Sequence, residues 1–493
     1  MPRCGAERLC WGSQIKILLL NTFQRPETTA GAYKRFLEPM PPITLAYLAA
    51  ALEAAGIDVE VYDDVVHDGD RASLEAKIRA SRPNVVGISV VTGTVGGASR
   101  AASIVRAADP SIKIVMGNIH ADLYAGEFLR KGLADFVVHE EGEVTLVELV
   151  RELAKASPSL EKVDGMSFRS NDGEVIRNKT RPFIEDLDAL PFPAWHLFPI
   201  EKYRIFNFAR VKEPGTLILG SRGCPFKCTF CSLIVNEGNR RRKRSVKSIA
   251  DECEWLYDKF GYKQASFIDP IFPFYKHEGV DFSQEMIRRG LHKKMVWITE
   301  TRVDLVDDEL MAAMYEGGLR RVMFGFETGS QEQLKRIRKG AKVDRGIEAA
   351  RAAKRAGVGV VGFFMIGIPG STREDIECTI KYASRALDID FAKFTVFVPY
   401  PGTAEYEKLK KAGAMPEPEN WDRFTSYPTG TRPPAYVPEG MTAADLIRYQ
   451  KKAYFAFYFR PRMVLNHLFQ ARTLSWRDAM AGLRLVASPS STS

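Results

Sequence analysis

The chain has 493 residues, of which 45% are hydrophobic and 27% charged, and its net charge is +9. This is the composition of an ordinary globular protein with room for about three domains. No apolar run approaches the ~20 residues of a membrane span, residues 1–14 lack an apolar signal core, and seven cysteines do not suggest a disulfide framework. We therefore expect a cytoplasmic protein.

After an N-terminal extension (1–14), residues 15–156 alternate strand patterns with helix patterns. The expected strands are 15–20, 57–62, 85–91, 112–116 and 135–138, and the expected helices are 43–55, 72–81, 97–108 and 144–156. Repeated units of this kind predict a doubly wound, Rossmann-like parallel sheet that binds its ligand at the carboxyl ends of the strands. Small, polar or flexible residues follow those strands: Ser89, Thr92, Gly117, Asn118, His120 and Gly142. Loops of any such sheet need these residue types, so they do not identify a ligand by themselves.

Residues 157–212 are predicted to be a connector with irregular structure. The turn at 170–173 indicates a small hairpin, and Trp195, Phe198, Tyr203 and Phe206 give the segment an aromatic surface. We expect this surface to pack between domains, or alternatively to line a cofactor cavity.

Three cysteines then follow a strand-like run at 216–219. Cys224, Cys228 and Cys231 form a C-x-x-x-C-x-x-C pattern in one short loop. Three thiolates complete neither a structural zinc site nor a four-iron cluster, each of which takes four ligands. Cys253, the next candidate, lies in a helical pattern further on. The spacing therefore favours a [4Fe–4S] cluster with one iron open to a cofactor or substrate over an incomplete zinc knuckle.

Residues 213–405 repeat strand and helix six times. The expected strands are 217–219, 264–268, 296–299, 321–326, 359–366 and 391–398. This number of units is typical of an open (βα)6 partial TIM barrel, in which reactive groups sit at the carboxyl ends of the strands. Asp269, Arg302, Glu327 and Gly367 follow four of these strands and are candidate site residues.

The cysteine loop, with Phe230 before its third cysteine, resembles the radical S-adenosylmethionine (radical SAM) superfamily. In that superfamily, SAM chelates the open iron, and its reductive cleavage gives a 5′-deoxyadenosyl radical. The resemblance implies that Cys224, Cys228 and Cys231 hold the cluster and that Glu327 acts with them as a catalytic residue. It further implies that Phe230, Asp269, Arg302, Glu327 and Gly367 contact SAM. An electron donor such as flavodoxin or ferredoxin is implied as a partner.

Residues 15–155 resemble the cobalamin-binding domain that precedes the radical SAM core in one large subfamily. The matching stretches are 41–49, 83–89, 116–121 and 135–143. Cobalamin would then lie against Ser89, Thr92, Gly117, Asn118, His120 and Gly142. The Asp-x-His-x-x-Gly motif that ligates cobalt is absent after the first strand, and the similar stretch at 64–69 follows the second strand. We expect cobalt without a protein histidine, and expect His120 and His139 to form hydrogen bonds in loops.

Two further segments leave alternatives open. The basic run Arg240–Arg244 could bind nucleic acid, but a structural role or an anionic substrate is favoured, with Ser245 as the N-cap of a helix over 246–260. The helical C-terminal domain, 406–493, contains helical patterns at 446–459, 463–471 and 476–486. These fit a helical lid that closes the barrel better than a membrane-surface helix.

The sequence thus predicts an α/β enzyme that uses a [4Fe–4S] cluster, SAM and cobalamin to methylate an unactivated carbon of a small molecule, a lipid or a tetrapyrrole. Oxidative cyclisation or rearrangement with the same cofactors is the alternative. An RNA methylthiotransferase is disfavoured because its N-terminal domain needs three more cysteines, and this one offers only Cys4 and Cys10. A nucleic-acid-binding protein without enzymatic activity is the remote alternative, so no nucleic acid partner is expected.

Overall fold

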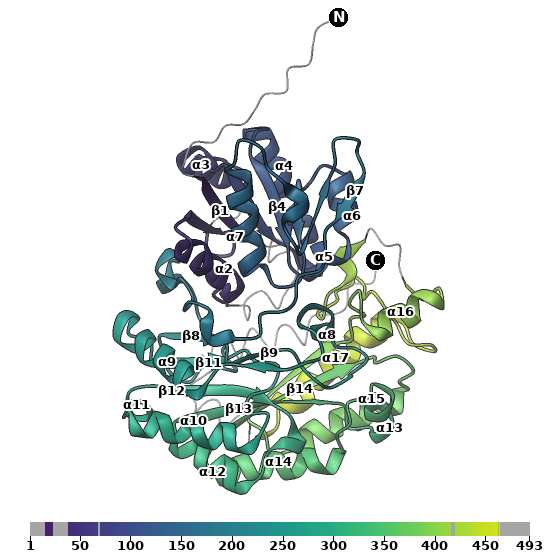
Figure 1. Cartoon of the computed structure of the whole chain (residues 1–493). Coiled ribbons are helices and arrows are strands. Elements are labelled where there is room, and N and C mark those ends of the chain that lie inside the picture. Colours follow the sequence, from purple (N-terminus) through teal and green to yellow (C-terminus); the bar gives the residue numbers. More distant parts are fainter. Residues whose placement is uncertain (1–14, 23–37, 68–69, 416–419, 462, 464–493) are drawn as a thin grey trace, which may run out of the picture. The chain divides into compact units, whose positions relative to one another are not determined.

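The structure, a computed structural model, describes residues 15–22, 38–67, 70–415, 420–461 and 463. The chain divides into two compact units (Figure 1): unit 1 comprises Met1–Arg25 and Pro41–Tyr203, and unit 2 comprises Pro26–Met40 and Arg204–Ser493. Helices predicted at 463–471 and 476–486 lie outside the described residues except for Met463. Among the helices described, none is both long and apolar enough to cross a bilayer.

Unit 1 is built on a seven-stranded sheet with strand order β2-β1-β3-β4-β5-β6-β7. The strands are β1 (Lys16–Asn21), β2 (Asp58–Asp63), β3 (Val85–Ser89), β4 (Lys113–Gly117), β5 (Phe136–Val138), β6 (Met166–Arg169) and β7 (Val175–Arg177). The helices are α2 (Ile43–Ala54), α3 (Arg71–Ser81), α4 (Val95–Ala108), α5 (Ile119–Leu123), α6 (Ala125–Arg130) and α7 (Gly142–Leu153). Strands β1 to β5 are parallel, which confirms the Rossmann-like prediction.

The connector belongs largely to unit 1. Its hairpin, β6 and β7, extends the sheet by antiparallel pairing of β6 with β5. Trp195 is fully buried, and the Ala194 amide donates to the Ala46 carbonyl in α2 at 3.0 Å. The Tyr203 hydroxyl donates to the Asp63 carboxylate at 2.8 Å. These contacts fasten the connector to the rest of unit 1.

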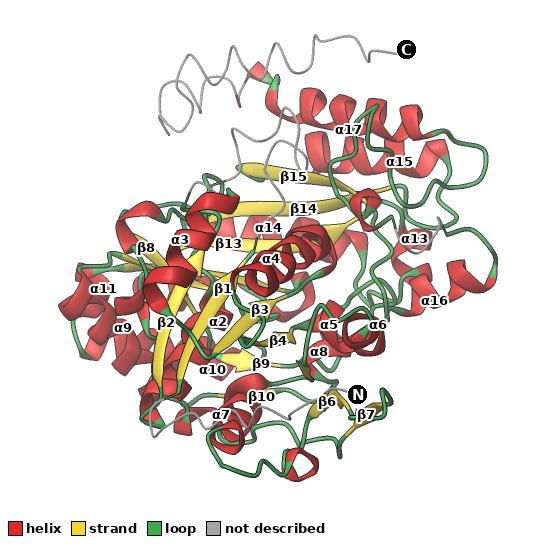
Figure 2. Ribbon diagram, turned by 90° about the horizontal axis from the view of Figure 1, so that it is seen from above, coloured by secondary structure: helices red, strands yellow, loops and turns green. Residues whose placement is uncertain are grey.

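Unit 2 is built on six parallel strands in the order β15-β14-β13-β12-β11-β8. Figure 2 shows β15, β14 and β13 side by side in this sheet. The strands are β8 (Gly215–Ile218), β11 (Gln264–Phe267), β12 (Val296–Thr301), β13 (Leu319–Glu327), β14 (Gly359–Ile366) and β15 (Phe391–Val396). The main helices are α8 (Leu233–Glu237), α9 (Val246–Phe260), α10 (Lys276–Arg288), α11 (Leu291–Lys294), α12 (Asp308–Glu316), α13 (Gln331–Arg336), α14 (Val343–Arg355), α15 (Arg373–Lys381) and α16 (Ala404–Lys411). This is the predicted partial barrel.

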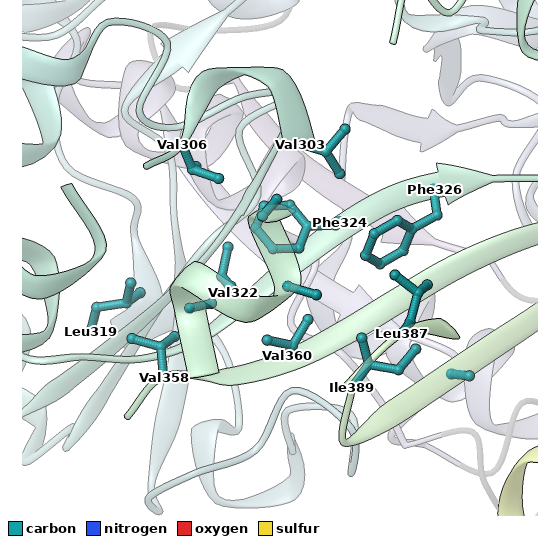
Figure 3. Close-up of a cluster of buried hydrophobic side chains, with 14 of the residues drawn as sticks. Val303, Val306, Leu319, Val322, Phe324, Phe326, Val358, Val360, Leu387 and Ile389 are labelled. Carbon is teal, nitrogen blue, oxygen red and sulfur yellow. The ribbon is translucent and has the colours of Figure 1, made fainter. Parts of the chain in front are cut away.

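The two faces of this sheet differ because side chains alternate along each strand. Phe324 and Phe326 of β13 and Val360 of β14 face the helices and join the largest hydrophobic core (Figure 3). Their neighbours Gly325 and Glu327 stand on the opposite face. We call that opposite face the inner face; it carries the polar groups of the candidate site.

The prediction that the C-terminal helix is a lid across the barrel is wrong for α17 (Ala443–Tyr458). Leu446, Ala453 and Phe457 are buried in the core on the helix-covered side of the sheet. The Gln450 side-chain amide donates to the Phe394 carbonyl of β15 at 2.9 Å. Helix α17 is therefore one more helix of the outer layer, and its apolar stripe serves that packing.

Candidate active site

The cysteine loop follows β9 (Ser221–Arg222), which pairs with β10 (Arg242–Lys243). Gly223 has φ +79°, and a Cβ there would lie 2.3 Å from the Arg240 carbonyl oxygen, so only glycine fits. Further along, the Thr229 amide donates to the Ile337 carbonyl at 3.0 Å, and the Glu405 amide donates to the Thr229 carbonyl at 3.1 Å. The loop is thus held from both sides by α13 and α16.

Asp269 fixes the entrance to this loop. Its carboxylate accepts hydrogen bonds from the Gly220 amide at 2.8 Å and from the Ser221 hydroxyl at 2.6 Å. Burial raises the pKa of Asp269 to about 7. Both oxygens are occupied within the protein, so the structure gives Asp269 the task of positioning the loop; its predicted contact with SAM remains a prediction.

The three thiols are free and half-buried. In the part of the chain that the structure describes, no three His, Cys, Asp or Glu side chains are arranged as a metal site. Burial raises the pKa of Cys228, against the opposing charges of Lys339 and Arg302, and raises that of Cys231 to about 11. Although they are not arranged as a metal site here, the three free thiols share one clamped loop beside two cations that would offset thiolate charge, and they are the donor set that an iron–sulfur cluster requires.

Phe230 and the Gly367 turn are brought together. Phe230 packs against Leu334, Ile337 and Ile368. Gly367 has φ +78° and Gly370 has φ +71°, and a Cβ on Gly370 would lie 1.9 Å from an Arg336 guanidinium nitrogen. The turn after β14 therefore lies beside the cysteine loop, as the sequence predicts.

Arg302 lies beside the same loop but is already engaged. Its Nε and Nη2 each donate to the Asp304 carboxylate at 2.9 Å, and its guanidinium lies 3.7 Å from the centre of the Phe226 ring. One edge of the guanidinium that the resemblance assigns to SAM is thus taken by Asp304. Stacking on Phe226 places the positive charge of Arg302 against the cysteine loop. The predicted contact between Arg302 and SAM would use the edge of the guanidinium that Asp304 does not occupy.

Glu327 ends β13 with a left-handed backbone, φ +64°. Lys339 Nζ donates to Glu327 Oε1 at 2.6 Å, and their side chains are only 11% and 10% exposed. A Cβ on Gly325 would lie 2.6 Å from Glu327 Oε1 and 2.9 Å from Lys339 Nζ. Burial lowers the pKa of Lys339, but Glu327 and Cys228 outweigh it, so the net shift is upward. Sequence reasoning missed Lys339, because it sits in a loop after α13 with no motif of its own.

We expect Lys339→Met to destabilise the protein by about 3–5 kcal/mol, because it leaves a buried carboxylate without its partner. Urea unfolding of the full chain measures this change, with Lys335→Met on the exposed side of α13 as the control. Adding Glu327→Gln to Lys339→Met should recover part of the loss. Equal stability of Lys339→Met and wild type would show that the pair does not hold Glu327.

The basic run serves structure. Arg241 donates two hydrogen bonds to Glu278, at 2.8 and 3.0 Å, and Lys243 donates to the same carboxylate at 3.1 Å. Arg244 pairs with the fully buried Glu252. The predicted N-cap is also confirmed, since the Ser245 hydroxyl accepts from the Ser248 amide at 3.1 Å. These charges are matched inside unit 2.

In unit 1, the candidate residues gather at the carboxyl ends of β3 and β4. The Asn118 side-chain amide donates to the Ser89 hydroxyl at 3.1 Å, and Asn118 Oδ1 accepts from the Ile119 amide that begins α5. A Cβ on Gly117 would lie 3.6 Å from the Val138 carbonyl oxygen, which is ordinary contact. The protein's own packing therefore does not require glycine at 117, which fits a position kept open for a ligand. At Gly142, by contrast, a Cβ would lie 3.0 Å from the Leu48 side chain.

His120 and His139 form hydrogen bonds, as predicted, and His67 forms one as well. His120 is 1% exposed, contacts the Thr92 hydroxyl at 3.2 Å and stacks on Tyr124, and burial lowers its pKa to about 4. His139 contacts Asp122 at 2.6 Å and Ser167 at 2.8 Å through its two ring nitrogens. His67 Nδ1 contacts the Asp63 carbonyl at 2.8 Å.

We therefore expect unit 1 to bind cobalamin without a protein histidine on cobalt. Electron paramagnetic resonance of the cob(II)alamin form should show no nitrogen hyperfine splitting from an axial imidazole. The spectra of His67→Ala and His120→Ala proteins should match wild type. Splitting that disappears in either variant would refute the expectation.

Comparison with known proteins supports both resemblances, the radical SAM core and the cobalamin-binding domain. The Radical SAM superfamily model matches residues 218–383, and the B12 binding domain model matches residues 34–150. An uncharacterized methyltransferase of Pyrococcus horikoshii is 33% identical, over 92% of this chain and 96% of that protein. The anaerobic magnesium-protoporphyrin IX monomethyl ester cyclase of Rubrivivax gelatinosus is 29% identical, over 75% of this chain and 66% of that protein.

A solved structure shares the fold over nearly the whole length. The radical S-adenosylmethionine methyltransferase TsrM from Kitasatospora setae, with cobalamin and a [4Fe–4S] cluster bound, superimposes with a TM-score of 0.70. The comparison covers 91% of this chain and 92% of TsrM, at 18% sequence identity. At that identity the likeness shows that the two proteins share a fold. It does not identify the reaction.

Proposed function

The chain belongs to the B12-binding radical SAM enzymes, and we propose that within this family it transfers a methyl group to an unactivated carbon of a small molecule. A [4Fe–4S] cluster, SAM and cobalamin are the cofactors of the family. The observation that carries the proposal is the relative that is 33% identical over 96% of its own length and is named an uncharacterized methyltransferase.

Different residues of the chain would bind the cluster and SAM. The clamped loop offers Cys224, Cys228 and Cys231 to the cluster. When bound, the cluster supplies the electron that cleaves SAM, and cobalamin supplies the methyl group. Glu327 keeps Oε2 for a ligand, since Lys339 occupies Oε1 and no hydrogen bond reaches Oε2 from the described residues. A carboxylate held in this way can accept from the ammonium or ribose hydroxyls of SAM.

The second candidate is oxidative ring closure without methyl transfer, which the 29% identical cyclase favours. The two reactions differ in the mass of the product. Methyl transfer adds one CH2 unit, whereas oxidative ring closure removes hydrogen. The cofactors are the same, so their presence alone does not separate the candidates.

The test supplies the reconstituted enzyme with a reductant, SAM labelled with a trideuterated methyl group, and small-molecule extract of the cells that carry this gene. Methyl transfer predicts a product that contains the intact labelled methyl group. A product without label, lighter than its precursor, would replace the proposal by ring closure. Enzyme lacking reductant is the control.

A further inference from the structure

The inner face of unit 2 carries two charged side chains that the site described above does not use, Glu300 on β12 and Lys393 on β15. Thr299 and Thr301, on either side of Glu300, are buried and donate to the carbonyls of Phe272 and Pro273. Ala392 and Phe394, on either side of Lys393, lie in the core under the helices. Because side chains alternate along a strand, Glu300 and Lys393 both stand on the inner face.

Neither charged group has a hydrogen-bond or ion-pair partner in the part of the chain that the structure describes. Both side chains are half-buried, and no hydrogen bond or ion pair reaches the Glu300 carboxylate or the Lys393 ammonium from those residues. The two attract each other electrostatically without touching. Burial raises the pKa of Glu300 to about 7 and lowers that of Lys393.

Charged groups of this kind lower the stability of the folded protein, since a charge removed from water needs a partner to offset its desolvation. The basic run shows the usual solution, because Arg241 and Arg244 are matched by carboxylates of the same unit. Glu300 and Lys393 have no such match. A ligand that donates to one and accepts from the other would supply it.

The surroundings of the pair are apolar and partly open. Phe363 and Met365 of β14 are half-buried on the inner face, and Ile268 after β11 is 40% exposed. Phe208 packs edge-on against Phe363, with ring centres 6.0 Å apart, and lies 5.7 Å from Lys393 Nζ. An apolar surface with a few convergent polar groups is the usual lining of a small-molecule site.

Glu300 is also close enough to the residues beside the cysteine loop to interact with them electrostatically. Glu300 interacts electrostatically with Lys339 and Glu327, and those two interact with Cys228. All of these groups belong to unit 2. A molecule held by Glu300 and Lys393 would therefore lie near the place where SAM is cleaved.

We propose that Glu300 and Lys393 form the substrate-binding site, with a hydrogen-bond donor of the substrate on Glu300, an acidic group on Lys393, and its apolar part on Phe363 and Met365. The inference rests on the proposed methyl transfer and adds the substrate class. The substrate is a water-soluble molecule that carries both a basic and an acidic group. A neutral lipid or hydrocarbon does not fit this pair of charges.

The experiment uses the reconstituted full chain with trideuteriomethyl SAM and the cell extract, in wild type, Glu300→Gln and Lys393→Met. The control variants are Glu407→Gln and Lys408→Met on the exposed side of α16. Three quantities are measured: labelled product, the increase in 5′-deoxyadenosine release caused by extract, and the affinity for SAM. Iron and cobalamin content show whether each variant is folded and loaded.

We expect labelled product and the extract-dependent increase to fall at least tenfold in Glu300→Gln and Lys393→Met, since each variant removes one partner of a desolvated charge contact. The affinity for SAM should change less than twofold, and the controls should match wild type. The labelled product should bind a cation exchanger in acid and an anion exchanger in alkali.

The site would be overturned by wild-type yields from both variants or by a labelled product that partitions as a neutral lipid. Loss of SAM affinity in parallel with product would also overturn it, because the pair would then belong to the SAM site. If wild type forms no labelled product, methyl transfer is refuted. The extract-dependent 5′-deoxyadenosine release then still decides the site, which is supported if the variants lose the response and overturned if they keep it.

Discussion

Replacement of Cys224, Cys228 or Cys231 by alanine should abolish the iron–sulfur cluster and, with it, all cleavage of SAM. Anaerobic reconstitution of the wild type should give about four irons per chain. The iron content of each variant should fall to the background level. The reason is geometric, since the clamped loop supplies three thiols and a cluster with two protein ligands would be left too weakly held. Iron analysis and 5′-deoxyadenosine release measure the two effects.

Two other cysteines provide matched controls. Cys253 is fully buried in the core between α9 and the sheet, where burial strongly raises its pKa. Cys378 is exposed on α15, with its thiol 3.3 Å from the Gly329 carbonyl oxygen. Alanine at either position should leave iron content unchanged, at a stability cost of about 1 kcal/mol or less for Cys253. If Cys253→Ala lost its cluster as the triplet variants do, the three-ligand site would be wrong.

Replacement of Gly117 by valine should abolish methyl transfer while leaving the cleavage of SAM intact. The residue is outside the left-handed region, and a Cβ there meets only ordinary contacts, so the variant should fold. Added bulk at the edge of the unit 1 sheet should weaken cobalamin binding by about tenfold to a hundredfold, since overpacking costs about 1–3 kcal/mol. The variant should still release 5′-deoxyadenosine from SAM but transfer no methyl group.

Glu327→Ala is the counterpart in unit 2. It removes the carboxylate beside the cysteine loop, so it should suppress both 5′-deoxyadenosine release and methyl transfer while leaving cobalamin binding intact. Cobalamin content by absorbance and product analysis by mass spectrometry distinguish the two variants. If Gly117→Val protein that lacks cobalamin methylated its substrate at the wild-type rate, unit 1 would have no role in methyl transfer.

The sequence predicts the regular parts of this molecule well, because periodicity and spacing report local structure directly. The strand 359–366 coincides with β14, and the helix after Ser245 with α9. The Cys224–Cys231 loop follows β8 as expected, with the two-residue strand β9 between them. Each of these features is encoded within a short stretch of the chain.

Other features depend on which distant residues meet, and the sequence does not contain that information in readable form. The amphipathic pattern at 446–459 identifies a buried stripe but not the surface that buries it, so α17 was expected as a lid and lies in the outer layer. Lys339 and Glu327 are separated by a helix, and Glu300 and Lys393 by two strands and several helices. Alternation assigns each of them to a face without revealing its neighbour.

The crowding at Gly325 has a consequence for how this protein can change over time. A Cβ at 325 would lie 2.6 Å from Glu327 Oε1 and 2.9 Å from Lys339 Nζ, so any side chain there would require the ends of this hydrogen-bonded pair to shift. Positions 325, 327 and 339 are therefore expected to covary among relatives, with a side chain appearing at 325 only where the acid–lysine pair has been lost. A substitution that is harmless in one relative would be disabling in another, so mutational tolerance at 325 depends on the genetic background.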